Sequence, residues 1–221
     1  MIFIILLILL QPCLSYAQEI SFMEEDFACL DATVQAEEKY QIQKHLLTSI
    51  SNVETGRWSE LLQQITAWPW SVNVGGKGYF YSSKEEAIAA VKSWQQKGYK
   101  SIDVGCMQVN LHFHGKEFAD LEDAFDPKKN VETAAKILTR RFQVRKDWMQ
   151  AATDYHSTLP HKARAYKKKL LLALDDAKTG SNRYLADYAG KLLAVPESKN
   201  WFPQWLESKQ LIDNMILSSR G

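Results

Sequence analysis

Hydrophobic residues recur every three or four positions over most of the chain, which is the spacing of residues on one face of an α-helix. The segments that show this spacing are 26–40, 44–54, 83–98, 126–142, 147–156, 160–174 and two stretches within 180–221. Glycines end two of these helices, because Gly56 stops the second and leaves Glu54 in its last turn, and Gly98 stops the third. The sequence therefore predicts a mainly helical protein.

The spacing changes to an alternation of apolar and polar residues over 68–81. Trp70, Val72 and Val74 alternate with polar residues, and the Gly-Gly-Lys-Gly sequence at 75–78 then predicts a turn before three returning aromatic residues. This pattern is typical of a β-hairpin. The expected fold class is therefore mainly α, or α+β with one small β-hairpin.

Three of the predicted helices have recognisable N-terminal residues. Ser83 is followed three residues later by Glu86, which is the spacing of a capping box. Asp126-Pro127 with Asn130 marks a second start, and Pro160 precedes a basic amphipathic helix. The apolar residues of that last helix are Tyr166, Leu170, Leu171 and Leu174.

The N-terminus has the pattern of a secretory signal. Ile2–Leu10 is an uncharged apolar run that is too short to span a hydrocarbon core of about 30 Å. Ser15-x-Ala17 resembles a cleavage site, and we interpret Cys13 as part of the signal. We expect residues 1–17 to be removed on export; an uncleaved anchor is the alternative.

The remaining chain predicts one main domain, residues 18–178, with a helical C-terminal extension over 179–221. Lysine and arginine number 27 against 26 acidic residues, and this balance argues against a nucleic-acid-binding protein, which would carry a basic face. His112 and His114 lie two residues apart, but no third ligand follows at a known metal-site spacing. We expect neither a metal nor another cofactor.

Without the signal the chain keeps two cysteines, Cys29 and Cys106. An even pair in an exported protein predicts a disulfide, and two buried free thiols are the alternative. The bridge would close a loop of 77 positions (106 − 29), which is worth about 4–5 kcal/mol on the chain-entropy model.

Glu54 is the first candidate catalytic residue. A carboxylate in the last turn of a helix lies at the negative end of the helix dipole, which opposes its ionisation, and burial near Trp58 or Trp70 would act in the same direction. A general acid that works near neutral pH needs this effect. The alternative is an exposed acid that precedes a C-terminal glycine.

Two later segments hold candidate sugar-binding residues. The amides of Gln108 and Asn110 can donate to and accept from sugar hydroxyl and acetamido groups. Tyr155 lies at a helix end and could orient an acid or a substrate acetamide. The alternatives are a helix start with a structural amide, and a core aromatic residue with its hydroxyl at the surface.

Together these segments resemble the soluble lytic transglycosylase family, whose catalytic domain has a lysozyme-like fold. Glu54-Thr55-Gly56 is similar to the family's Glu-Ser-Gly helix end, and Gly105-Cys106-Met107-Gln108-Val109-Asn110 to its Gly-x-Met-Gln-(Ile/Val)-Asn turn. Ala152-Thr153-Asp154-Tyr155 is similar to its Ala-x-x-Tyr helix, and the helix start at Asp126-Pro127 looks like its connecting segment. The resemblance covers about residues 26–170.

The chain departs from the family pattern at three places. Thr55 replaces a serine and keeps the hydroxyl, whereas His156-Ser157 replaces an Asn-Ala-Gly continuation after the tyrosine. A long insert, roughly 59–100, lies between the first two motifs. Its aromatic residues could line a glycan groove or pack in the core, and we favour core packing. These residues are Trp68, Trp70, Tyr79 and Tyr81.

The resemblance implies a lysozyme-like or goose-type-lysozyme-like helical domain that cleaves the β-1,4 bond between N-acetylmuramic acid and N-acetylglucosamine in peptidoglycan. Glu54 would protonate the glycosidic oxygen and then, as a carboxylate, take the proton of the muramyl C6 hydroxyl. The products would be 1,6-anhydromuramyl ends. The implied substrate contacts are Thr55, Met107, Gln108, Asn110, Tyr155 and His156.

We expect a periplasmic monomer that acts on peptidoglycan glycan strands; opening the wall for a secretion apparatus or a flagellum would use the same activity. Two other functions compete with this hypothesis. A lysozyme-type hydrolase would need a second acid that positions water, and Asp103 is the candidate, although a turn or cap role is the interpretation that we prefer. A non-catalytic wall-binding scaffold would not need Glu54.

Overall fold

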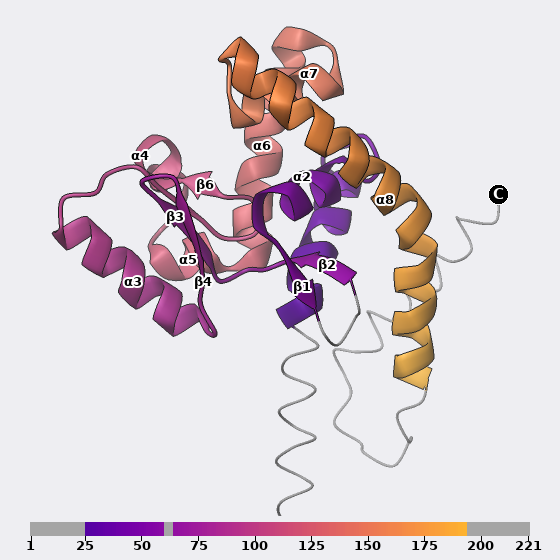
Figure 1. Cartoon of the computed structure of the whole chain (residues 1–221), viewed down its shortest axis with the longest axis horizontal. Helices are drawn as coiled ribbons and strands as arrows, with labels where there is room; N and C mark the ends of the chain where they lie inside the picture. The colour runs from indigo at the N-terminus through magenta and orange to yellow at the C-terminus, as the bar shows by residue number, and fades with distance from the viewer. Residues whose placement is uncertain (1–24, 60–63, 194–221) are drawn as a thin grey trace, which may run out of the picture. The chain divides into compact units, whose positions relative to one another are not determined.

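The structure is a computed structural model that describes residues 25–59 and 64–193, with side chains as far as residue 178 (Figure 1). The chain divides into two compact units, Met1–Leu174 and Asp175–Gly221. The predicted signal at 1–17 lies outside the described residues, as do residues 194–221 of the predicted extension. None of the helices among the described residues combines the length and apolar character needed to cross a bilayer.

The first unit is mainly helical, and its helices confirm the segments that the apolar spacing predicts. The first helix covers residues 25–39, and α2 (Leu46–Thr55) ends directly before Gly56, the glycine that was expected to stop it. The later elements are α3 (Lys84–Gln96), α4 (Leu111–His114), a 3₁₀ turn (Gly115–Glu117), α5 (Leu121–Phe125), α6 (Pro127–Arg145), α7 (Trp148–His156) and the start of α8 (Pro160–Leu193).

The predicted hairpin is present as β3 (Ser71–Val74) and β4 (Lys77–Phe80), which pair antiparallel. Gly75 and Gly76 form the two-residue turn with φ values of 61° and 80°, and this left-handed conformation explains the two glycines. The sheet continues on the other side of β3 with β5 (Ile102–Val104) and β6 (Val109–Asn110) in the order β4-β3-β5-β6.

A second antiparallel pair, β1 (Gly56–Ser59) and β2 (Gln64–Ala67), was not predicted. It begins directly at the end of α2, where Gly56 approaches the backbone closely. A Cβ at Gly56 would lie 2.3 Å from the Asn52 carbonyl oxygen and 2.7 Å from Cγ2 of Ile65. The glycine is therefore required by space, because its φ of −62° is open to any residue.

Helix caps confirm two predicted starts. The Ser83 hydroxyl accepts a hydrogen bond from the Glu86 backbone N–H, as in a capping box. The Glu86 carboxylate, however, accepts from the hydroxyl and backbone N–H of Ser82, so the return bond of the box goes to the residue before Ser83. Asp126 caps α6 by accepting from the N–H of Lys129, and Pro127 follows in the first turn.

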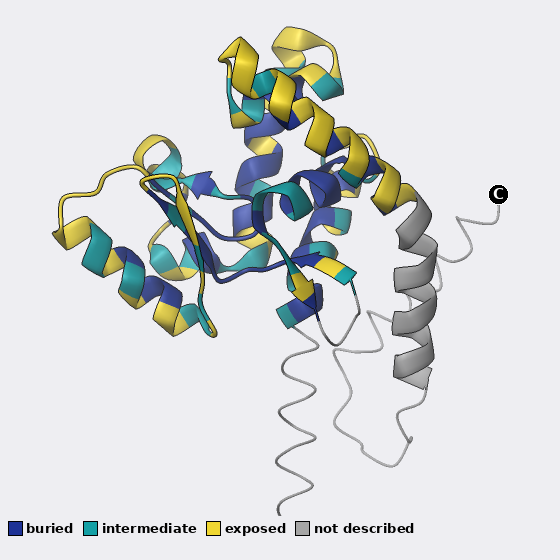
Figure 2. Ribbon diagram, in the orientation of Figure 1, coloured by how far each residue is buried: buried dark blue, intermediate teal, exposed yellow. Residues whose placement is uncertain are grey.

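The core of the first unit lies between α2, the four-stranded sheet and α6, whose inner faces are buried (Figure 2). Leu46, Leu47 and Ile50 of α2 are fully buried, and Leu138 of α6 packs in the same cluster. Trp68 and Trp70 of the insert also belong to this cluster, which confirms core packing for both.

The first turns of α8 bury one narrow face. Tyr166, Leu170 and Leu174 are buried at four-residue spacing. Leu171, expected on the same face, is 49% exposed, because the next residue along a helix is rotated by about 100° away from its neighbour. The expectation for Leu171 was therefore wrong.

Candidate active site

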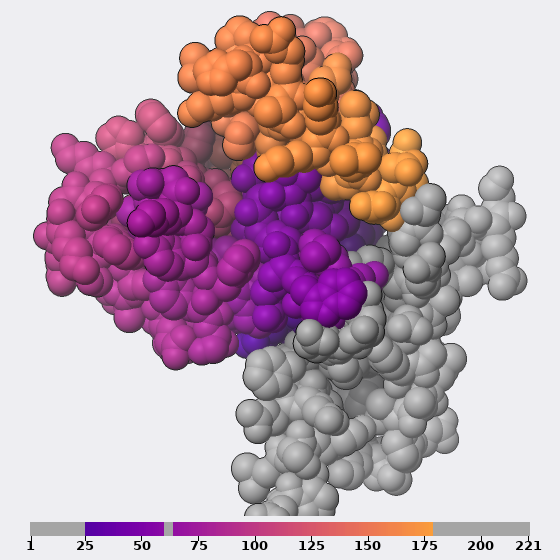
Figure 3. Space-filling model, in the orientation of Figure 1, coloured from indigo at the N-terminus to yellow at the C-terminus, as the bar shows by residue number. Residues whose placement is uncertain are grey.

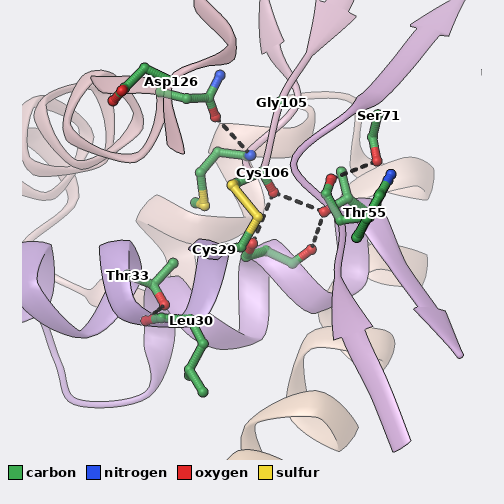
Figure 4. Close-up of a disulfide and its surroundings, with 12 residues drawn as sticks. Cys29, Leu30, Thr33, Thr55, Ser71, Gly105, Cys106 and Asp126 are labelled. Carbon is green, nitrogen blue, oxygen red and sulfur yellow. Dashed lines mark hydrogen bonds between the residues drawn. A yellow bond between two sulfur atoms is a disulfide. The ribbon is translucent and has the colours of Figure 1, made fainter. Parts of the chain in front are cut away.

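A disulfide between Cys29 and Cys106 joins the first helix to the loop between β5 and β6 (Figure 4). The predicted bridge is confirmed, and the alternative of two free thiols is not what the structure shows. This loop carries Gly105, Met107 and Gln108, so the covalent link fixes the second motif against the helical core.

The end of α2 is fastened to the same loop by two buried hydroxyl groups. Ser51 donates to the Cys106 carbonyl oxygen at 2.9 Å, and Thr55 donates to it at 3.0 Å. Thr55 is only 2% exposed and also lies 3.1 Å from the Ser51 carbonyl oxygen. The substrate contact at Thr55 stays a prediction, and in the structure its buried hydroxyl holds the position of Glu54.

Asn130 is the buried centre of this loop, and sequence reasoning identified it only as part of a helix start. Its side-chain oxygen accepts from the Met107 N–H at 3.0 Å, and its side-chain nitrogen donates to the carbonyls of Val104 at 2.9 Å and Ala124 at 2.8 Å. Gly105 has a φ of +76°, and a Cβ there would lie 2.4 Å from the Asn130 amide nitrogen. The loop conformation therefore depends on both residues.

Met107 and Tyr155 are connected by a hydrogen bond across the core. The Tyr155 hydroxyl donates to the Met107 carbonyl oxygen at 2.8 Å, and the Met107 side chain is fully buried. The substrate contact at Met107 stays a prediction, and in the structure its side chain packs in the core. Tyr155 lies in the last turn of α7 and links this helix to the loop of the second motif.

The two amides of the second motif have different surroundings. Gln108 is half-buried, and its side-chain nitrogen donates to the carbonyls of Ser71 and Gly105. The Asn110 side chain caps α4 through the N–H groups of its second and third residues and also donates to Asp103 at 2.7 Å. The structure therefore shows Asn110 as a structural amide at a helix start, which was the alternative interpretation.

Glu54 lies in the last turn of α2, and its side chain is 15% exposed. Nδ1 of His156 lies 3.4 Å from Oε1 of Glu54, which is within ion-pair range. Within the described residues this oxygen is buried and forms no hydrogen bond of normal geometry. A buried carboxyl oxygen without a donor is costly in a folded protein, and such positions are characteristic of functional sites.

Tyr166 of α8 completes the surroundings of Glu54, and the sequence placed it only on a buried helix face. Its ring stacks on His156 with centroids 4.2 Å apart and an interplanar angle of 4°. Burial first, and the nearby Glu54 carboxyl next, raise the pKa of Tyr166 well above its ordinary value. Its buried hydroxyl also has no well-formed hydrogen bond among the described residues.

Electrostatic coupling connects Glu54 with residues of β5 and α7. Burial raises the pKa of Asp103, Asn110 opposes this through its hydrogen bond, and Glu54 raises it further. Burial, Glu54 and Asp103 raise the pKa of Tyr155. Four acidic or phenolic groups therefore lie close together, on α2, β5, α7 and α8. An additional negative charge among them would be unfavourable.

The segments that carry this site lie beside one another on one face of the first unit, where α2 (purple) lies next to the start of α8 (orange) in Figure 3. Two cavities of about 200 Å³ each lie elsewhere, one lined by Leu111 and Phe118 and the other by Ala36 and Lys39. Neither cavity is lined by Glu54, so the groups around its carboxyl are what identify it as a candidate catalytic residue. The part of the chain that the structure describes contains no cluster of three or more His, Cys, Asp or Glu side chains arranged for a metal ion.

Comparison with known proteins gives one match. The family model described as Transglycosylase SLT domain matches residues 31–170. No curated protein and no solved structure matches the chain. The matched span contains Glu54, the second motif and the α7 motif, and it confirms the resemblance on which the sequence analysis relied.

Proposed function

The chain belongs to the Transglycosylase SLT domain family, which has a lysozyme-like helical fold and acts on peptidoglycan, and we propose that Glu54 is its single catalytic acid and base. The observation that carries this proposal is the Glu54 carboxyl itself. It lies at the end of α2 and is 15% exposed, and its buried Oε1 forms no hydrogen bond of normal geometry among the described residues but faces Nδ1 of His156 at 3.4 Å. A largely buried carboxyl beside an imidazole can serve as a general acid and base.

The proposed reaction is the cleavage of the β-1,4 bond between N-acetylmuramic acid and N-acetylglucosamine. Glu54 transfers its proton to the glycosidic oxygen as that bond breaks, and the substrate's own 2-acetamido group stabilises the positive anomeric carbon. The Glu54 carboxylate then takes the proton of the muramyl C6 hydroxyl while O6 bonds to C1. The product is a 1,6-anhydromuramyl end, no water is consumed, and Glu54 regains its proton.

The other proposed site residues support this reaction in different ways. Gln108 is a substrate contact, because its side-chain oxygen accepts no hydrogen bond within the described residues and is available to a sugar N–H or O–H. Tyr155 positions the second motif through its hydrogen bond to Met107. Asn110 acts indirectly, since its side chain caps α4 and binds Asp103.

Hydrolysis is the second candidate activity, and the coupling of Asp103 to Glu54 is the observation that favours it. A hydrolase of this kind would use the second acid to orient water. The position of Asp103 favours a supporting role, because it accepts a hydrogen bond from Asn110 at 2.7 Å within the β5–β6 pair. A non-catalytic wall-binding scaffold has less support, because it would not require a largely buried acid that faces an imidazole.

We further propose that residues 18–178 form the catalytic domain, that 179–221 form a helical extension, and that the chain works as a periplasmic monomer after removal of residues 1–17. The Cys29–Cys106 disulfide supports export, because such bonds persist in oxidising compartments. We propose a secretion apparatus or a flagellum as a setting for this activity, because both need an opening in the wall.

Mass spectrometry of purified peptidoglycan digested by the protein distinguishes the two reactions. Transglycosylation gives anhydromuramyl ends, whereas hydrolysis adds one water and gives reducing ends. We expect anhydro products from the wild type and from Asp103→Asn. Reducing-end products that disappear in Asp103→Asn would instead establish hydrolysis.

A further inference from the structure

The ring of His156 is held between the catalytic acid and a buried tyrosine. Nδ1 lies 3.4 Å from Oε1 of Glu54, and the ring stacks on Tyr166 with centroids 4.2 Å apart. The His156 side chain is 39% exposed, so it lies at the boundary between this site and solvent. The stack fixes the plane of the ring, and the end of α7 fixes its position.

We propose that His156 is a positioning residue that shares the proton of Glu54 and extends the cleavage activity toward neutral pH. This inference rests on the proposed role of Glu54 and goes beyond the substrate contact that was expected of His156. The geometry supports it, because Nδ1 of His156 lies 3.4 Å from Oε1 of the Glu54 carboxyl.

The proton balance of this couple follows from the chemistry of its two groups. An isolated glutamic acid loses its proton near pH 4.3 and an imidazole near pH 6.5. A carboxyl and an imidazole in contact titrate as a pair and can hold one proton between them. The shared proton passes through the Glu54 carboxyl to the glycosidic oxygen as that bond breaks, which leaves a carboxylate beside a neutral imidazole. The carboxylate then takes the C6 hydroxyl proton as O6 bonds to C1, and this second proton restores the couple.

The charged and titratable groups that face His156 come from four elements. Glu54 ends α2, Asp103 lies on β5 and interacts with both Glu54 and His156, and Tyr166 lies on α8. Tyr155 precedes His156 on α7 and is influenced by Arg141 of α6. Asp103 is the group that could compete for the same proton, so its variant is the necessary control.

The sequence suggests two substitutions for the test. His156 stands where the resembling family has an asparagine, so His156→Asn introduces a family residue that cannot hold a proton. His156→Gln is longer and can still donate to Glu54. Both variants keep a polar side chain, whereas neither can supply the shared proton.

The experiment is the pH dependence of kcat/KM for release of anhydromuropeptides from purified peptidoglycan by the full chain. We expect the alkaline limb of the profile to move by about 1–2 pH units toward acid in both variants, which lowers the rate at pH 7 roughly 10- to 100-fold while the rate near pH 5 stays close to wild type. Asp103→Asn removes a neighbouring negative charge but keeps His156, so we expect it to move the alkaline limb less than either His156 variant does.

A rate reduction of equal size at every pH, or an unchanged profile, would overturn the shared-proton role of His156. Those results leave the proposed function intact if Glu54→Gln is inactive. A wild type without turnover, or an active Glu54→Gln, removes the proposed function and this inference with it.

A measurement that does not depend on activity covers the case in which the His156 variants fail to fold. The ring resonances of His156 are titrated by NMR in the wild type and in Glu54→Gln. A titration curve that moves when Glu54 loses its charge supports the couple, and identical curves overturn it.

Discussion

The hydroxyl of Thr55 donates a hydrogen bond to the carbonyl oxygen of Cys106 at 3.0 Å, so the residue next to Glu54 is fastened directly to a half-cystine. The first and second motifs, 51 residues apart, are therefore one structural unit. The position of the acid depends on this contact, on Ser51, and on the covalent bond to Cys29.

Replacing Thr55 by valine should destabilise the protein by about 1–3 kcal/mol, because the Cys106 carbonyl loses one of its two buried donors and the shape of the side chain is kept. Thr55→Ser keeps the hydroxyl and should retain most of the stability. Urea unfolding with the disulfide intact measures both. A valine variant as stable as the wild type would show that the contact contributes nothing.

Loss of the disulfide should lower the free energy of unfolding by about 4 kcal/mol through the loop entropy of the unfolded chain. The double variant Cys29→Ala/Cys106→Ala should also cut the peptidoglycan-cleavage rate, since the loop that holds the end of α2 is released. Thermal unfolding and turnover of the variant and of the reduced wild type check this. Equal stability with and without the bridge would contradict it.

Gly105 and Gly76 form a matched pair for testing the role of Asn130. Both have positive φ, +76° and +80°, but only a Cβ at Gly105 meets a neighbour, at 2.4 Å from the Asn130 amide nitrogen. Gly76→Ala should cost about 1–2 kcal/mol from backbone conformation alone, and Gly105→Ala clearly more. Chemical denaturation compares the two, and equal losses would exclude a steric contribution from Asn130.

Glu37 should give the protein a pH-dependent stability. Burial raises its pKa to about 7 from 4.5, although backbone N–H groups of His45 and Thr48 donate to it. The folded state then binds more protons than the unfolded state between these values, so stability is full below pH 4.5 and falls by about 3 kcal/mol as the pH rises through 7.

Unfolding of Glu37→Gln at pH 5 and at pH 8 tests this, because the variant cannot ionise and should lose most of that slope. Gln keeps a side-chain oxygen for one of the two backbone donors, which makes it the closest neutral substitute. A variant with the same slope as the wild type would mean that other groups control the pH dependence.

The helices and the hairpin could be predicted because their apolar residues follow periods of 3.6 and 2, and because residues such as Asp126 and Gly75 mark their ends. The β1–β2 pair could not, because Gly56–Ser59 contains only one large apolar residue and the connecting residues 60–63 contain no glycine, proline, asparagine or aspartate to predict a turn.

The candidate site was only partly predictable. Local motifs pointed to Glu54 and Tyr155, but they could not show which atoms would be buried. The burial of the Thr55 and Met107 side chains, for example, depends on tertiary packing. Tyr166 was recognisable as a buried helix residue. That its ring faces His156, ten positions earlier and on another helix, is a tertiary contact that helical spacing does not encode.

The most direct test of the account is the turnover of purified peptidoglycan by Glu54→Gln, with Asp103→Asn measured beside it and thermal unfolding used to verify that both variants fold. We predict that Glu54→Gln loses at least about 10³-fold in rate, as expected for removal of the only general acid and base, while Asp103→Asn stays active. A correctly folded Glu54→Gln that releases anhydromuropeptides within tenfold of the wild-type rate would contradict the assignment of Glu54.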